Sequence, residues 1–245
     1  MLAPAIRSQS ELFAPEDAPL PVTGGTKPFR MQLLKWVGNK QKQANAIIDF
    51  FPKQFDTYFE PFLGSGGVLG VLAPKKAVAS DTFAPLVQIW QTLHEDRDAL
   101  KRHYAERYAL IAQLGKKAAY DKVLASYNAA PNGADLLFLC RACYGGVVRF
   151  RKYDGYMSTP VGVHDPVSPE SFGKRVDIWH ARTQGLVLYI RTSQRLWVKR
   201  NRGIWFIATL HTPIAKQFFT VRRLSLYNVS LTPLLLVKHG VCMWH

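Results

Sequence analysis

A ligand site is indicated by two features whose residue types and spacing suit one, the turn Gly64–Gly67 (GSGG) and the carboxylate of Asp81. The turn follows an apolar stretch at 56–62 that predicts a short buried strand, and Asp81 ends a second predicted strand at 75–81. Glycines let the backbone approach a ligand that a Cβ would repel, and a carboxylate at the next strand tip can accept both hydroxyls of a ribose. The pattern favours a nucleotide-like ligand, with an ordinary connection between two elements as the alternative.

Basic and aromatic side chains alternate in a second group of residues, between positions 145 and 169. Arg149, Arg151 and Lys152 interleave there with aromatic side chains and glycines. Basic and aromatic side chains in a hairpin-like loop suit contact with phosphates and with bases. The alternative is a solvated hairpin whose aromatic side chains pack underneath it.

Cys140 and Cys143 form a C-x-x-C pair without the second pair that a zinc site of this kind needs. The pair predicts a packed helix face, and no metal site is expected. With Cys242 the chain has three cysteines, an odd and sparse number that gives no disulfide framework and fits a cytoplasmic protein.

The elements that must position these residues follow an α/β pattern. A helix is predicted over 40–51, closed by Pro52, and a second helix over 68–73 leaves the glycine turn between the two strands. Strand, glycine turn, helix, strand and acidic residue make the first βαβ half of a nucleotide-binding sheet. Further helices are predicted over 84–114, over 134–145 and from a Ser168 cap to Gly185.

Composition supports a folded domain with a polyanionic partner. The chain has 245 residues, of which 48% are hydrophobic, and no apolar run of about 18 residues, so a membrane span is not expected. Residues 1–26 lack the order of a secretory signal and predict a flexible leader. The net charge of +15 favours nucleic acid as a partner.

The charge is concentrated at the end of the chain. Residues 186–245 carry nine Lys and Arg side chains and no Asp or Glu. This segment is also too apolar for a solvated basic arm, and it has no steady helical or alternating periodicity. The change of composition near Gly185 therefore needs its own explanation.

Four blocks, in order, resemble the Dam-type (D12 class) N6-adenine DNA methyltransferases over about residues 27–185. They are LKWVGNK at 34–40, EPFLGSGG at 60–67, Asp81, and CYGGVVRF at 143–150 with STPVG at 158–162. The resemblance implies a Rossmann-like fold that binds S-adenosylmethionine and transfers its methyl group to the amino group of adenine in double-stranded DNA. Members of this class include enzymes of restriction-modification systems.

The resemblance also implies roles for single residues. The cofactor-binding positions would be Trp36, Lys40, Glu60, Pro61, Phe62, Gly64, Gly66 and Asp81. The DNA-binding positions would be Tyr144, Val147, Arg149, Arg151 and Lys152, since arginine is the usual reader of a guanine edge. The chain departs from the commonest family pattern at Gly145 and Val147, so the target sequence stays open, as does the oligomeric state.

The family's catalytic block, D-P-P-Y, is missing from this sequence. In the family its Asp and a backbone carbonyl hold the amino group of the flipped adenine, and its Tyr stacks on the base. The last acidic residue of the chain is Asp177, so no later carboxylate can substitute. No catalytic residue is therefore assigned, and the chain as written is expected to be inactive.

A change of reading frame after about residue 186 would explain both the missing block and the unusual tail. Allowed codons for residues 188–226, read one frame over, can encode a string that contains DFTEA and then PGDMVYCDPPY. The shifted image of D-P-P-Y is Ala208, Thr209, Leu210 and His211. Residues 186–245 are accordingly predicted to be an out-of-frame tail that leaves the sheet without its last strands.

The sequence thus predicts four segments. They are the leader at 1–26, a cofactor-binding part at 27–83, a helical and DNA-recognition region at 84–185 with an insertion around 84–175, and the tail at 186–245. The rival interpretation is a non-catalytic, basic nucleic-acid-binding protein whose tail is genuine.

Overall fold

The computed structural model contains a six-stranded sheet in the order β3-β2-β1-β4-β5-β6. The structure describes residue 29, residues 31–52 and 54–190, and the backbone of three later strands. The strands are β1 (Thr57–Glu60), β2 (Ala77–Asp81), β3 (Leu186–Ile190), β4 (Ile204–Leu210), β5 (Phe218–Arg223) and β6 (Leu234–Leu235). Strands β1 to β4 are parallel, and β5 and β6 each run antiparallel to the preceding strand. The expected α/β fold is confirmed.

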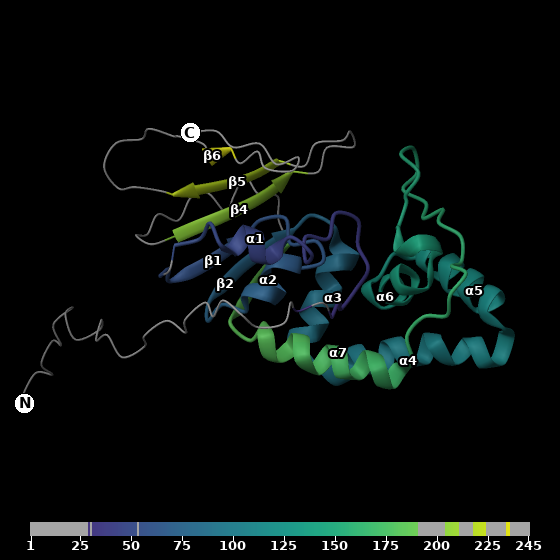
Figure 1. The fold of residues 1–245 in the computed structure, drawn as a ribbon. Helices are drawn as coiled ribbons and strands as arrows, with labels where there is room; N and C mark the ends of the chain where they lie inside the picture. The colour runs from purple at the N-terminus through teal and green to yellow at the C-terminus, as the bar shows by residue number, and fades with distance from the viewer. Residues whose placement is uncertain are drawn as a thin grey trace, which may run out of the picture.

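Helices lie against one part of this sheet and extend to one side of it. They are α1 (Ala44–Ile48), α2 (Gly67–Leu72), α3 (Ala84–Glu95), α4 (Arg97–Leu114), α5 (Lys116–Ala129), α6 (Gly133–Ala142), the short 3-10 helix η2 (Tyr144–Gly146) and α7 (Pro169–Arg182). Figure 1 shows the sheet at the left, α4, α5 and α6 at the right, and α7 along the bottom. The hairpin that follows α6, residues 143–161, has antiparallel bridges between Cys143 and Val161 and between Phe150 and Met157, and it rises from the right-hand group.

The predicted order of strand, glycine turn, helix and strand is confirmed in β1, α2 and β2. The first predicted helix is shorter than expected, because only Ala44–Ile48 is helical. The stretch over 84–114 divides into two helices at Asp96, whose side chain accepts a hydrogen bond from Ala99 N at 2.8 Å and caps α4. Helix α5 was not predicted. Ser168 caps α7 through Ser171 N at 3.2 Å, as expected.

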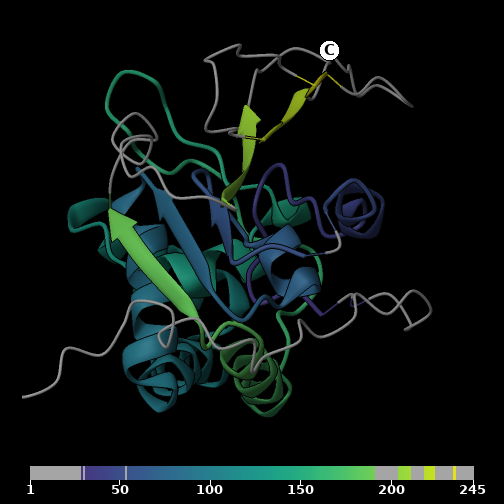
Figure 2. The same cartoon turned by 90° about the vertical axis from the view of Figure 1, so that its left-hand side faces the viewer.

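The prediction that the sheet lacks its last strands is wrong, because the backbone of β4, β5 and β6 forms part of the sheet. Strand β4 pairs with β1, from Thr57 opposite Ile204 to Phe59 opposite Phe206, and β5 and β6 extend the sheet beyond it. Figure 2 shows β3, β2 and β1 side by side, with the later strands continuing on the far side of β1. The physical reason lies in residue types, since 204–210 (IWFIATL) is rich in β-branched and aromatic residues that favour strands.

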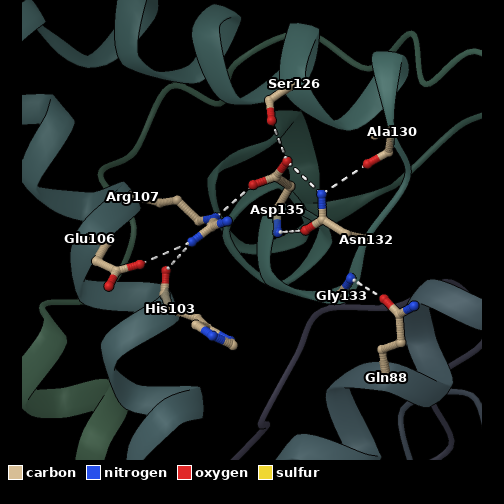
Figure 3. Close-up of polar contacts among 9 residues, drawn as sticks. All are labelled: Gln88, His103, Glu106, Arg107, Ser126, Ala130, Asn132, Gly133 and Asp135. Atoms are coloured by element: carbon tan, nitrogen blue, oxygen red, sulfur yellow. Dashed lines mark hydrogen bonds and ion pairs between the residues drawn. The ribbon is translucent and has the colours of Figure 1, made fainter.

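A buried carboxylate joins the helices at the right of Figure 1. Asp135 of α6 accepts hydrogen bonds from Arg107 Nε of α4 at 2.7 Å and from Ser126 Oγ of α5 at 2.8 Å (Figure 3). The adjacent Gly133 N donates to Gln88 Oε1 of α3 at 2.8 Å. One polar cluster therefore fixes four helices around the N-terminal end of α6.

Within the described residues, none of the helices is both long enough and apolar enough to cross a bilayer.

Candidate functional site

A cavity of about 400 Å³ lies at the carboxyl ends of β1 and β2. In parallel sheets, ligands bind outside the carboxyl ends of the strands where the strand order reverses, and here β1 lies between β2 and β4 at that reversal. The volume is within the range of small-molecule sites. The lining residues are Trp36, Val37, Gly38, Lys40, Glu60, Phe62, Leu63, Gly64, Ser65, Gly67, Asp81, Val148 and Phe150.

The glycine turn lines this cavity through Gly64, Ser65 and Gly67, and the protein packed around the turn leaves no room for a side chain at Gly66 or Gly67. Gly66 has a φ of +61°, and a Cβ built on it would lie 2.7 Å from the ring of Trp90. A Cβ on Gly67 would lie 2.7 Å from both Asn39 Oδ1 and Gln41 N. Trp90 also donates from Nε1 to Gly64 O at 3.0 Å. The turn is therefore held from below by an indole ring and from one side by the segment around Asn39.

Asp81 connects the two strand ends at the rim of the cavity. Its Oδ2 accepts a hydrogen bond from Gly64 N at 2.9 Å, and its Oδ1 accepts one from Phe83 N at 3.0 Å. A carboxylate oxygen can accept more than one hydrogen bond, so both oxygens keep capacity for a ligand. The half-buried Asp81 side chain lines the cavity and can receive hydroxyl donors.

Glu60, the last residue of β1, is a buried carboxyl in the cavity wall. Its side chain is 4% exposed, and its Oε2 accepts from Tyr58 OH at 3.1 Å and from Leu69 N at 3.2 Å. Burial raises the pKa of Glu60 to about 8, with a further increase from the charge of Asp81, although the two hydrogen bonds act in the opposite direction. At neutral pH this carboxyl is mainly protonated.

The segment before α1 contributes the opposite wall. Trp36 is half-buried, and the side chain of Lys40 is 8% exposed, so burial lowers the pKa of its amine. Helices α6 and α7 hold the backbone of this segment. Arg141 Nη1 donates to Leu33 O at 2.8 Å, and Trp179 Nε1 donates to Met31 O at 2.8 Å.

An aromatic series connects the cavity with the hairpin that follows α6. The ring centroids of Trp36 and Phe83 are 5.6 Å apart, and those of Phe83 and Phe150 are 5.2 Å apart. Phe150 also lies 6.3 Å from Tyr127 of α5. The hairpin is therefore part of the cavity wall and is not a separate lobe.

The hairpin exposes most of the predicted DNA-binding residues. Tyr144, Val147, Arg149 and Lys152 are exposed, and Tyr144 reaches 60%. The backbone beneath them is fixed by hydrogen bonds, with Arg149 N donating to Thr159 Oγ1 at 2.8 Å. The exposed face therefore combines positive charge with aromatic and aliphatic surface on a fixed backbone.

Arg151 differs from these residues because its guanidinium is engaged within the hairpin. It lies 3.8 Å from the ring centroid of Tyr156, donates from Nη1 to Tyr153 OH at 2.6 Å and pairs with Asp154 at 3.6 Å. These contacts stabilise the tip of the hairpin and leave Arg151 less available than Arg149 or Lys152.

The structure brings most of the predicted cofactor-binding residues together. Trp36, Lys40, Glu60, Phe62, Gly64 and Asp81 line the cavity, whereas Pro61 and Gly66 support it from behind. Sequence reasoning missed Val148 and Phe150, although their alternation with the exposed residues of the hairpin was a signal.

The remaining predictions concern β4 and the cysteines. Ala208, Thr209 and Leu210 are the last residues of β4, and His211 lies outside the described residues. Cys140 and Cys143 are buried, and burial raises the pKa of their thiols to about 12 and about 11. Among the described residues no group of three or more His, Cys, Asp or Glu side chains could hold a metal ion.

Comparison with known proteins gives consistent matches. The family model described as D12 class N6 adenine-specific DNA methyltransferase matches residues 36–162. A type II methyltransferase of Methanocaldococcus jannaschii is 29% identical over 155 residues, which cover 56% of this chain and 52% of that protein. A DNA N-6-adenine-methyltransferase of Escherichia phage P1 is 25% identical over 128 residues, covering 51% of this chain and 17% of that protein. The chain therefore spans about half or less of the length of these relatives.

Proposed function

The chain belongs to the D12 class of N6 adenine-specific DNA methyltransferases, and from this premise we propose that its cavity binds S-adenosylmethionine beside a surface for duplex DNA. The observation that carries this proposal is the cavity itself, which gathers the glycine turn, Asp81 and Trp36 at the reversal of strand order. The order β3-β2-β1-β4 also supports a Rossmann-like fold, because doubly wound sheets have this order in their first four strands.

The residues present fit such a ligand. Gly64 and Gly67 of the turn line the cavity, and glycines let the backbone approach a ligand closely. Asp81 has free acceptor capacity for ribose hydroxyls, Trp36 offers an apolar wall, and Lys40 can pair with the carboxylate of the methionine part. When bound, the cofactor supplies the electrophilic methyl group, and the protein binds and orients it.

DNA binding is proposed for the exposed face of the hairpin. Arg149 would contact a base edge, and Lys152 would contact phosphates. Tyr144 and Val147 would add contacts beside them.

We further propose that the chain as written does not transfer the methyl group to adenine. Strand β4 runs parallel to β1, so its last residues, 208–210, lie at the same end of the sheet as Glu60, and they contain no carboxylate. Without that acceptor nothing positions the adenine amino group, and positioning together with charge stabilisation supplies much of the rate. A change of reading frame near codon 187 remains our explanation, and the nucleotide sequence of codons 185–188 tests it directly.

The experiment is calorimetric titration of the purified 245-residue chain with S-adenosylmethionine, followed by a methylation assay on duplex DNA. We expect binding without methylation, and methylation by a frame-restored variant. Asp81→Ala should weaken cofactor binding by roughly 1–3 kcal/mol, the usual cost of leaving hydrogen-bonding groups unpaired. Cofactor-dependent adenine methylation by the chain as written, with its mass confirming the tail, would show that the missing block is not needed.

The second candidate function is non-catalytic nucleic-acid binding, favoured by the net charge of +15. The same titration separates the two, because this candidate predicts DNA binding without any heat from S-adenosylmethionine.

A further inference from the structure

The hairpin that carries the proposed DNA-reading residues also forms part of the cavity wall. Exposure to solvent alternates along the extended residues 147–150. Val147 and Arg149 are exposed, whereas Val148 is buried and Phe150 is half-buried. Val148 and Phe150 line the cavity. Consecutive side chains of an extended segment point to opposite sides, so Arg149 faces away from the cavity that Phe150 lines.

We propose that Phe150 is a positioning residue that couples occupancy of the cavity to DNA binding by the hairpin. The inference rests on the proposed function, since it assumes that the cavity and the hairpin take the ligands assigned above. It adds a reciprocal effect, in which each ligand raises the affinity for the other through this one side chain.

The contacts of Phe150 explain how coupling would arise. On the protein side its ring packs against Phe83 at 5.2 Å and Tyr127 at 6.3 Å, and the ring is only half-buried because the cavity lies beside it. A ligand in the cavity buries more of the ring and restricts it. Arg149 directly precedes Phe150, so restricting the ring also restricts the backbone of Arg149. DNA binding to the hairpin then costs less conformational entropy.

A second connection joins the same two parts of the molecule. Arg141, in the last turn of α6 immediately before the hairpin, holds Leu33 O on the segment that carries Trp36. A Cβ on Gly146, in η2, would lie 2.5 Å from Lys35 Cδ, so the start of the hairpin lies directly against this segment. The hairpin is therefore attached to two walls of the cavity. A ligand can touch its Val148 and Phe150 side chains, and of these Phe150 also packs against Phe83 and Tyr127.

The test measures duplex affinity in the absence and presence of saturating S-adenosylhomocysteine, which cannot donate a methyl group. Fluorescence anisotropy of a labelled 30-base-pair duplex gives the two dissociation constants for the full 245-residue chain. We expect S-adenosylhomocysteine to tighten duplex binding at least about five-fold, the lower end of usual coupling between sites. Phe150→Ala should bring this ratio close to one, and Phe150→Tyr should restore it.

Tyr153→Ala is the matched control, because it removes an exposed aromatic side chain of the same hairpin that does not line the cavity. It should change duplex affinity equally in both conditions and leave the ratio unaltered. A purely structural role of Phe150 would likewise lower both affinities without changing their ratio. An unchanged ratio in Phe150→Ala would therefore overturn the proposal.

Hydrogen exchange on the wild-type protein provides a test that needs no variant. S-adenosylhomocysteine should slow exchange of the amides at 147–151, and unchanged exchange with demonstrated binding would also refute the coupling. If the wild-type chain binds no S-adenosylhomocysteine in calorimetry, the proposed function is wrong. If both ligands bind and neither affects the other, only the coupling is wrong.

Discussion

Replacing Glu60 with glutamine should remove much of the pH dependence of folding stability in this protein. Glu60 is 4% exposed, and its pKa is raised to about 8 from an ordinary value of 4.5, mainly by burial. Between these two values the folded state holds a proton that the unfolded state releases. The free energy of unfolding therefore falls as the pH rises through this window.

The size of the effect follows from the two pKa values. Between pH 5.5 and 8.5 the linkage amounts to about 3 kcal/mol of unfolding free energy, at 1.36 kcal/mol for each pKa unit. Glutamine retains an acceptor for Tyr58 OH and Leu69 N but does not titrate. Glu60→Gln should consequently be more stable than the wild type at pH 8.5 by a few kcal/mol, and should differ from it much less at pH 5.5.

Urea unfolding of both proteins at the two pH values, without added ligand, measures this difference. Glu95→Gln is the control, because it removes an exposed carboxylate and should leave the pH dependence of the wild type intact. If Glu60→Gln lost stability with pH as steeply as the wild type, then Glu60 would not hold a proton in the folded protein. The inference that the Glu60 carboxyl is protonated at neutral pH would then be wrong.

Three further predictions concern other parts of the molecule. Gly66→Ala should cost about 2–4 kcal/mol of stability in thermal unfolding, because it combines a positive φ with a Cβ 2.7 Å from Trp90, whereas Gly173→Ala in α7 should be tolerated. Burial and the nearby His180 lower the pKa of His94 to about 4, so stability should fall as the pH drops from about 6.5 to 4, and His94→Gln should flatten that decrease in a pH series of melting temperatures. Arg149→Ala should relax the sequence preference at one base pair, whereas Lys152→Ala should weaken binding to all sequences and reduce its salt dependence, as measured by competition binding at several salt concentrations. A uniform loss of affinity in Arg149→Ala would contradict its base-reading role.

The parts of the fold that could be predicted are those that local sequence determines. Strand β1, the turn at Gly64–Gly67 and strand β2 lie within 25 consecutive residues, so glycine positions and apolar runs were sufficient. The break at Asp96 was missed, because the residues on both sides favour helix and only the capping side chain separates α3 from α4. Strands β3 to β6 all lie in the predicted out-of-frame tail and were missed, because their pairing is non-local and their sequence does not alternate.

For the cavity too, only the residues that belong to local motifs could be predicted. Trp36, Lys40, Glu60 and Asp81 belong to motifs whose spacing could be recognised, and the structure brings them together. Phe150 joins them from a position more than 60 residues beyond Asp81, through a hairpin whose return to the sheet depends on helices α3 to α6. Only packing among those helices, including the cluster around Asp135, determines that return.

The hydrogen bonds that hold the segment before α1 also determine when the cavity can form during synthesis. Trp179 Nε1 contacts Met31 O across 148 positions of sequence, and Arg141 contacts Leu33 O across 108. At about 5–20 residues per second, the ribosome needs roughly 7–30 s to reach Trp179 after Met31. Contacts of such long range also slow folding, since the loop entropy must be lost before they form. In a nascent chain the contact between Trp179 and Met31 therefore cannot form until α7 has left the ribosome, and the segment that carries Trp36 is without this support until then.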